Sequence, residues 1–203
     1  AARREYNDRA AAGAARLRGL ADVVGALTTF AGAEGPRRYL IAGANNAEMR
    51  DQGMVLSFAV VEIDGGNVEV IRSDPIEALT IRQPVPIAVP AGTQAIFGPL
   101  EPTREWRSVN ASADTALSGS SMASMYEAAT GDAVDGVVTV DVPVLIALLE
   151  VLGPVEVEGF GALSSDTAGP FLLSRQYDGI PAAAPRQRVR RESVADVARA
   201  VVV

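Results

Sequence analysis

The chain has 203 residues, of which 48% are hydrophobic and 21% charged, enough for one globular domain with a sizeable core. It contains no Cys and no His, and all 18 basic residues are Arg because Lys is absent. These absences exclude disulfides, thiol nucleophiles, Ser/His/Asp triads, imidazole metal ligands, Walker A loops and Schiff-base lysines.

Charge is distributed unevenly along the chain, whose net charge is −7. Residues 1–40 carry seven Arg against four acidic residues, residues 41–174 five against eighteen, and residues 175–203 six against three. The acidic balance argues against a nucleic-acid partner. A basic tail on an acidic body indicates local Arg sites.

Residues 3–31 are predicted to form a long amphipathic helix, because Leu17, Leu20, Val24 and Leu27 share the spacing of one helical stripe. No window holds the ~18 consecutive apolar residues of a membrane span, and no signal peptide is recognisable. The sequence begins and ends inside helical patterns, so we expect a piece of a longer protein. In this interpretation residues 1–33 are a helix that could serve as a stalk from a membrane anchor outside the sequence, and residues 34–203 form the main domain.

The next elements are predicted to be strands. The apolar run Tyr39–Ala42 indicates a buried strand, and Met54–Ile63 with Asn67–Ile71 indicate a hairpin around an Asp-Gly-Gly turn. Residues 75–102 hold six of the twelve prolines, which predicts a long surface loop with one helical turn. Such a loop is either a binding loop or a plain connection.

The second half alternates between helices and strands. We predict helices at 112–130, 143–152, 166–177 and from Arg191 onward, and strands at 134–140 and 155–157. This alternation predicts a three-layer α/β/α domain with a central mixed sheet, preceded by the long N-terminal helix.

A polar loop, Asn45–Gly53, follows the first predicted strand and contains Glu48, Arg50 and Asp51. Ligands of open α/β sheets usually bind beyond the carboxyl ends of the strands. A carboxylate beside an Arg can hold a divalent cation while the Arg faces a phosphate. The alternative is a capped turn whose side chains bond only to loop backbone.

Further Arg residues could join this loop. Arg72 and Asp74 end the second hairpin strand, where an Arg is also commonly a solvated rim residue. Arg175 and four Arg within residues 186–191 could clamp an oxyanion or form salt bridges to the acidic body. The segment Asn110–Asp114 is predicted to form an Asx turn and a helix N-cap.

Three segments in order resemble a known pattern: YLIAGANNAEMRDQG, YEAATGDAVDGVV and LLEVLGPV. Together with the Asp-Gly-Gly hairpin, they resemble a bacterial envelope family called domain of unknown function four-zero-one-two. The resemblance covers residues 37–203.

More distantly, the layout is similar to the LytR-CpsA-Psr family, whose members transfer glycopolymers from polyprenyl pyrophosphate carriers to the cell wall. Arg50-Asp51 matches that family's Arg-Ser-Asp loop, and Arg72 with Asp74 matches its strand-end pair. The acidic residue after the first strand is replaced by Asn45 or Asn46, and Tyr177 replaces the second Arg of an Arg-x-Arg site.

The resemblance implies a fold of the LytR-CpsA-Psr type, an extracytoplasmic location and a Mg²⁺-dependent phosphotransferase. It implies that Asp51 and Asp74 hold Mg²⁺, that Asp51 or Glu48 acts as base, and that Arg72 acts in catalysis. The pyrophosphate of a lipid-linked glycan would then be clamped by Arg50, Arg72, Arg175 and Arg191, with a cell-wall polymer as acceptor. The alternatives are a non-catalytic binder of a polyprenyl-phosphate lipid or wall polymer, and an envelope assembly domain.

Overall fold

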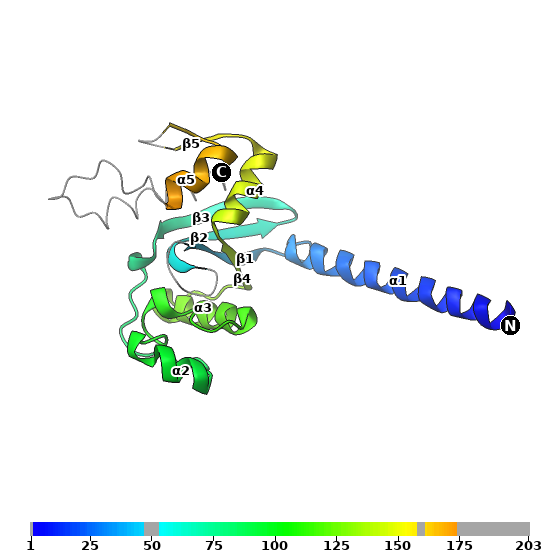
Figure 1. Ribbon diagram of the computed structural model, residues 1–203, viewed down its shortest axis with the longest axis horizontal. Helices are drawn as coiled ribbons and strands as arrows, with labels where there is room; N and C mark the ends of the chain where they lie inside the picture. The colour runs from blue at the N-terminus through cyan, green and yellow to red at the C-terminus, as the bar shows by residue number, and fades with distance from the viewer. Residues whose placement is uncertain (1, 47–52, 158–160, 174–203) are drawn as a thin grey trace. The chain divides into compact units, whose positions relative to one another are not determined.

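The computed structural model describes residues 2–46, 53–157 and 161–173 (Figure 1). The chain divides into two compact units, one of Ala1–Arg37 with Ile63–Val68 and one of Arg38–Glu62 with Glu69–Val203. No helix in the described parts of the chain is long and apolar enough to span a membrane.

The first unit consists of helix α1 (Ala2–Phe30) and the tip of the β-hairpin. The hairpin turn donates two backbone hydrogen bonds to the end of α1, from Gly65 N to Gly32 O at 3.1 Å and from Gly66 N to Ala31 O at 2.8 Å. Gly32 has φ +70°, and a Cβ there would overlap the Ile63 carbonyl, so this junction requires glycine. The predicted helix is present, and its apolar stripe is exposed.

The central sheet has four strands in the order β3-β2-β1-β4: β1 (Arg37–Asn45), β2 (Met54–Asp64), β3 (Asn67–Pro75) and β4 (Gly136–Val140). β1 and β4 are parallel, with Gly43 opposite Val140. β2 runs antiparallel to β1. Arg38, near the start of β1, bonds to Glu62 near the end of β2, and Gly43, near the end of β1, lies against Ser57 near the start of β2. The predicted mixed sheet is therefore confirmed.

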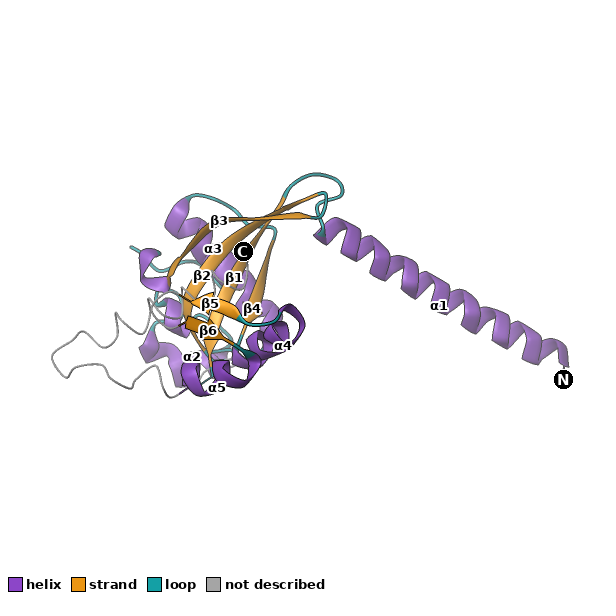
Figure 2. Ribbon diagram, turned by 90° about the horizontal axis from the view of Figure 1, so that it is seen from above, coloured by secondary structure: helices purple, strands orange, loops and turns teal. Residues whose placement is uncertain are grey.

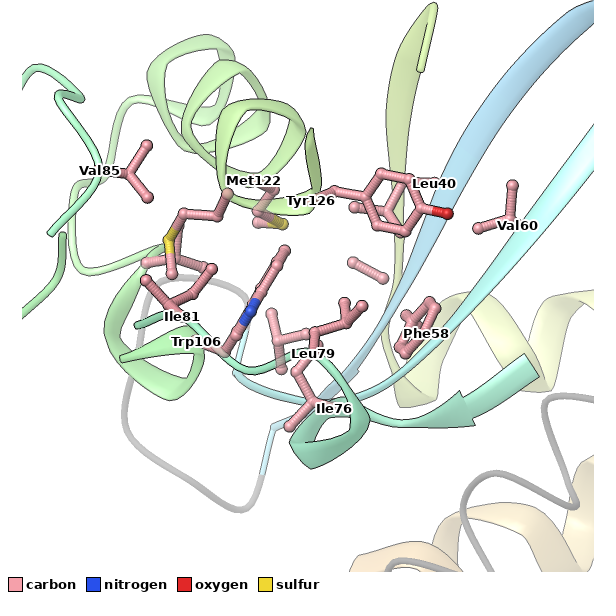
Figure 3. Packing of buried hydrophobic residues seen from close by; sticks show 14 residues of the cluster. Leu40, Phe58, Val60, Ile76, Leu79, Ile81, Val85, Trp106, Met122 and Tyr126 are labelled. Atoms are coloured by element: carbon pink, nitrogen blue, oxygen red, sulfur yellow. The ribbon is translucent and has the colours of Figure 1, made fainter. Parts of the chain in front are cut away.

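One face of the sheet packs against α3 (Thr115–Thr130) through the main apolar core (Figure 3). Phe58 of β2 meets Tyr126 of α3 edge to face, with 6.2 Å between ring centroids. Gly131, with φ +84°, ends α3, as predicted. The helix begins at Thr115, three residues later than predicted, where Asp114 Oδ1 accepts from Leu117 N at 3.0 Å and caps the helix.

The connection from β3 to α3 begins with the proline-rich residues 75–102, which are mostly exposed, as predicted for a surface loop. The prediction is corrected in one respect, because apolar side chains of this connection are part of the core. The connection contains 3₁₀ turns at Ile76–Ala78, Gly98–Leu100 and Trp106–Ser108 and the helix α2 (Ala91–Phe97). Within residues 75–102, Ile76 is 2% exposed and Leu79 4%, and Trp106, which follows them, is 4% exposed. The prolines of the connection exclude regular strands, but they do not prevent its apolar side chains from packing on the sheet.

A second apolar cluster is formed by α4 (Val142–Leu152), α5 (Ser165–Leu173) and the antiparallel pair β5 (Val155–Val157) and β6 (Gly161–Leu163). Figures 1 and 2 both place α4 and α5 on the side of the sheet opposite α3, which gives the predicted three layers. The short β6 was not predicted. The predicted helix from Arg191 lies outside the described residues.

Candidate functional site

Three strands end at the same edge of the sheet. β1 and β4 are parallel, and β3 follows β2 through a hairpin, so the carboxyl ends of β1, β3 and β4 share one edge. This edge carries Asn45 and Asn46 from β1, Arg72 and Asp74 from β3, and Asp141 after β4. The strand ends that carry these residues thus lie along one edge of one sheet.

Arg72 has defined contacts at this edge. Its Nε donates to Asp74 Oδ2 at 2.6 Å, and its Cζ lies 5.1 Å from the centroid of the Phe58 ring. Phe58 is 1% exposed, whereas the Arg72 side chain is 38% exposed. The aromatic face and the carboxylate orient the guanidinium, whose terminal nitrogens have no hydrogen-bond partner among residues 2–46, 53–157 and 161–173.

The exit of β1 is joined to the start of α4. Asn46 Oδ1 accepts from Val142 N at 3.0 Å, and Asn46 Nδ2 donates to Asp141 Oδ2 at 3.3 Å. Asp141 Oδ1 in turn accepts from Val144 N at 3.0 Å and caps the helix. Asn46, one of the two residues that stand where the resemblance implies an acid, therefore has a structural role.

The return of the loop into β2 is fixed at Gly53. Asn110 Nδ2 donates to Gly53 O at 2.7 Å, and Asn110 is 2% exposed. Gly53 has φ +104°, and a Cβ there would overlap the Asn45 carbonyl. Asn110 was predicted to form a local Asx turn, and its actual partner is 57 residues away.

Most of the other predicted site residues lie outside the described residues: Glu48, Arg50, Asp51, Arg175 and Arg191. Their convergence with Arg72 stays a prediction. Asp74, the other predicted Mg²⁺ ligand, bonds to Arg72. Among the residues that the structure describes, no three acidic side chains are grouped as a metal site.

A cleft of about 400 Å³ begins two residues beyond Asp74, and its lining was not predicted from the sequence. Its apolar lining includes Ile76, Leu79 and Trp106. At its rim, Arg107 donates from Nε to Glu105 Oε1 at 3.1 Å and from a terminal nitrogen to Oε2 at 3.2 Å. The hydrogen bond to Glu105 raises the pKa of Arg107, so the Arg107 guanidinium keeps its charge.

Ser57 carries a buried hydroxyl on the face of β2 away from α3. Ser57 is 1% exposed, its hydroxyl lies over Gly43, and its Oγ has no hydrogen-bond partner within the described ranges. A buried polar group without a partner costs ~1–3 kcal/mol. Serine is common on exposed strand faces, so no sequence pattern indicates that Ser57 is buried.

We expect Ser57→Ala to raise the free energy of unfolding by ~1 kcal/mol, because alanine removes a hydroxyl that forms no compensating bond. Ser118→Ala is the matched control: Ser118 is 3% exposed, and its hydroxyl donates to Ser112 O at 3.1 Å. Urea denaturation should show the control destabilised by a similar amount. Equal destabilisation of both variants would show that the Ser57 hydroxyl is satisfied in solution.

Residues 34–177 match the family described as "Protein of unknown function (DUF4012)". No curated protein and no solved structure matches the chain significantly. The family match begins just before β1 and contains the sheet, the strand-end pair Arg72 and Asp74, and the cleft lined by Trp106. Because the match covers most of the sequence, the chain belongs to the DUF4012 family.

Proposed function

We propose that this chain works at the extracytoplasmic face of a bacterial membrane, where it binds a glycan carried on polyprenyl pyrophosphate. The observation that carries the proposal is Arg72, held by Phe58 and Asp74 at the edge where three strands end. A guanidinium oriented in this way is suited to phosphate oxygens. Arg50 belongs to the segment that joins Asn46 to Gly53, both of which lie at this edge.

The order of motifs along the sequence is similar to that of the LytR-CpsA-Psr enzymes. This similarity favours transfer of the glycan to a cell-wall polymer. In that reaction a hydroxyl of the acceptor attacks the pyrophosphate, so no protein nucleophile is required. Developing charge on the phosphates would be stabilised by Arg72 and Arg50 with Mg²⁺, and Asp51 or Glu48 would accept the proton. A chain without Lys, His and Cys can carry out this chemistry, because it requires only Arg, a carboxylate and a metal ion.

A second candidate, binding without turnover, is favoured by one contact. Asn45 or Asn46 replaces a carboxylate of the implied Mg²⁺ site, and the amide nitrogen and oxygen of Asn46 bond to Asp141 and Val142. A site with one acid fewer holds a divalent cation less tightly and still binds a pyrophosphate through Arg. The two candidates share the anion site and differ in the metal.

The anion site is tested by titrating the chain with farnesyl pyrophosphate. We expect Arg72→Gln to weaken binding ~10–100-fold, because a charge-assisted hydrogen bond contributes ~1.5–3 kcal/mol. Arg38→Gln is the matched control, because Arg38 also pairs with one acid, Glu62 at 2.9 Å, at the opposite end of β1. Equal affinity in the wild type and both variants would refute the anion site.

Transfer is tested separately with a glycan on polyprenyl pyrophosphate. Mg²⁺-dependent release of the lipid phosphate that is lost in Arg72→Gln would establish the enzyme. If the lipid-linked glycan binds in a way that depends on Arg72 but no lipid phosphate is released, the chain is a non-catalytic binder.

A further inference from the structure

The apolar stripe of α1 has the spacing of a coiled-coil seam. The alternation of three- and four-residue steps runs over the whole helix through Tyr6, Ala10, Gly13, Leu17, Leu20, Val24 and Leu27. An apolar heptad sustained over three to four repeats is typical of a coiled coil. Arg18, Asp22 and Ala26 lie away from this seam, on the outer face of the helix.

This seam is exposed in the single chain. Every described side chain from 12 to 30 is exposed, including Leu17 at 68%, Leu20 at 62% and Leu27 at 60%. α1 also contains Gly13, Gly19 and Gly25, and glycine is the weakest helix former after proline. Because helices gain most of their stability from packing, a helix of this composition requires a partner along its seam.

We propose that two copies of this chain dimerise through α1 as an antiparallel two-stranded coiled coil. In an antiparallel seam Leu17 of one copy lies opposite Leu20 of the other. The same register places Gly13 opposite Val24 and Ala10 opposite Leu27. The outer layers then pair a large residue with a small one, and the two central layers pair two leucines. The seam is therefore symmetric, and the helix axes are equally far apart at its two ends.

The parallel arrangement fits less well. It would place Gly13 against Gly13 at one end and Leu27 against Leu27 at the other, so the two helices would diverge along the seam. In the antiparallel register the flanking Arg16 lies beside Val23 of the second copy, so its apolar stem covers the seam and no like charges face each other.

The seam has enough area for an association of moderate strength. Full burial of a large aliphatic side chain contributes about 1.5–3 kcal/mol, at about 25 cal/mol per Å² of apolar surface. Each such side chain therefore removes about 60–120 Å² from water. Four such residues on each helix remove about 500–1,000 Å², near the ~1,000 Å² at which specific interfaces begin. A second copy of the same chain is the partner whose small residues match these large ones.

Sedimentation equilibrium of the full chain tests the dimer. At ~100 μM we expect the wild type to have the mass of two 21.1 kDa chains. Leu20→Glu should weaken the affinity of the two copies at least ~100-fold, because it places a charge in the seam. Ala26→Glu is the matched control, since it adds the same charge on the outer face and should dimerise like the wild type. A wild-type monomer, or equal weakening in both variants, would overturn the proposal.

Cysteine cross-linking tests the orientation, because the native chain has no Cys. The double variant Gly13→Cys/Val24→Cys should form intermolecular disulfides. Val24→Cys alone should not, because the two copies of residue 24 would be ~16 Å apart along the axis. Cross-linking of Val24→Cys alone would show a parallel pair and overturn the proposal, as would a monomer that binds only anionic phospholipid vesicles.

Discussion

Replacing Gly53 with Ala is expected to lower the free energy of unfolding by at least ~2 kcal/mol, because the native backbone excludes a side chain there. Gly53 has φ +104°, and an added Cβ would overlap the backbone carbonyl of Asn45. Neither group can shift without disturbing the bond from Asn110 Nδ2 to Gly53 O. Urea denaturation followed by circular dichroism measures the loss.

Gly131→Ala separates this overlap from the cost of a positive φ alone. Gly131 has φ +84°, and a Cβ there would meet no heavy atom within 4 Å. We expect this control to lose only ~1 kcal/mol, the usual penalty for Ala at the end of a helix. If both variants lost the same amount, the close approach of Gly53 to Asn45 would not exist in solution. Because Gly53 ends the loop that contains Arg50 and Asp51, Gly53→Ala should also weaken pyrophosphate binding.

Trp106→Ala is expected to cost ~3–5 kcal/mol, the range for removal of a large aromatic side chain from a core. Trp106 is 4% exposed and belongs to the cluster that includes Leu79 and Ile81 (Figure 3). Thermal and urea unfolding should both detect the loss. Trp106→Phe should cost less, because it keeps a ring and the indole N–H has no partner in the described part of the chain.

Ile96→Ala provides the matched control within the same segment between β3 and α3. Ile96 of α2 is 71% exposed, so its truncation should change stability by less than ~0.5 kcal/mol. A small effect of both substitutions would mean that the segment is a surface loop, as its prolines first indicate. A large effect of Trp106→Ala alone would confirm that the segment closes the core.

Local signals predict most of this fold. The Asp-Gly-Gly turn indicates the hairpin, and the cap segment that ends in Asp114 with Gly131 indicates α3. Pro143 in the first turn and Gly153 after the last indicate α4. The segment between β3 and α3 is not predictable in this way, because whether Trp106 packs on the sheet depends on residues far away in sequence. The strand β6 is also missed, since three residues are too few for a recognisable alternation.

The candidate site is predictable in its residues and not in its contacts. Arg72 and Asp74 stand at the end of a predictable strand, so their place at the sheet edge follows from the hairpin. That Phe58 lies under Arg72 depends on the register of β2 against β3, which the sequence pattern leaves undetermined. Asn46 capping α4 depends equally on the parallel pairing of β1 with β4.

The central claim is that Arg50 and Arg72 hold one pyrophosphate at the strand-end edge. A double-mutant cycle with Arg50→Gln, Arg72→Gln and the double variant tests it most directly, with the free energy of farnesyl pyrophosphate binding as the measured quantity. If both guanidinia contact one ligand, the two losses are coupled by ~0.5–3 kcal/mol, because each Arg binds an anion that the other has helped to fix. Additive losses, or an affinity that neither substitution changes, would contradict the claim.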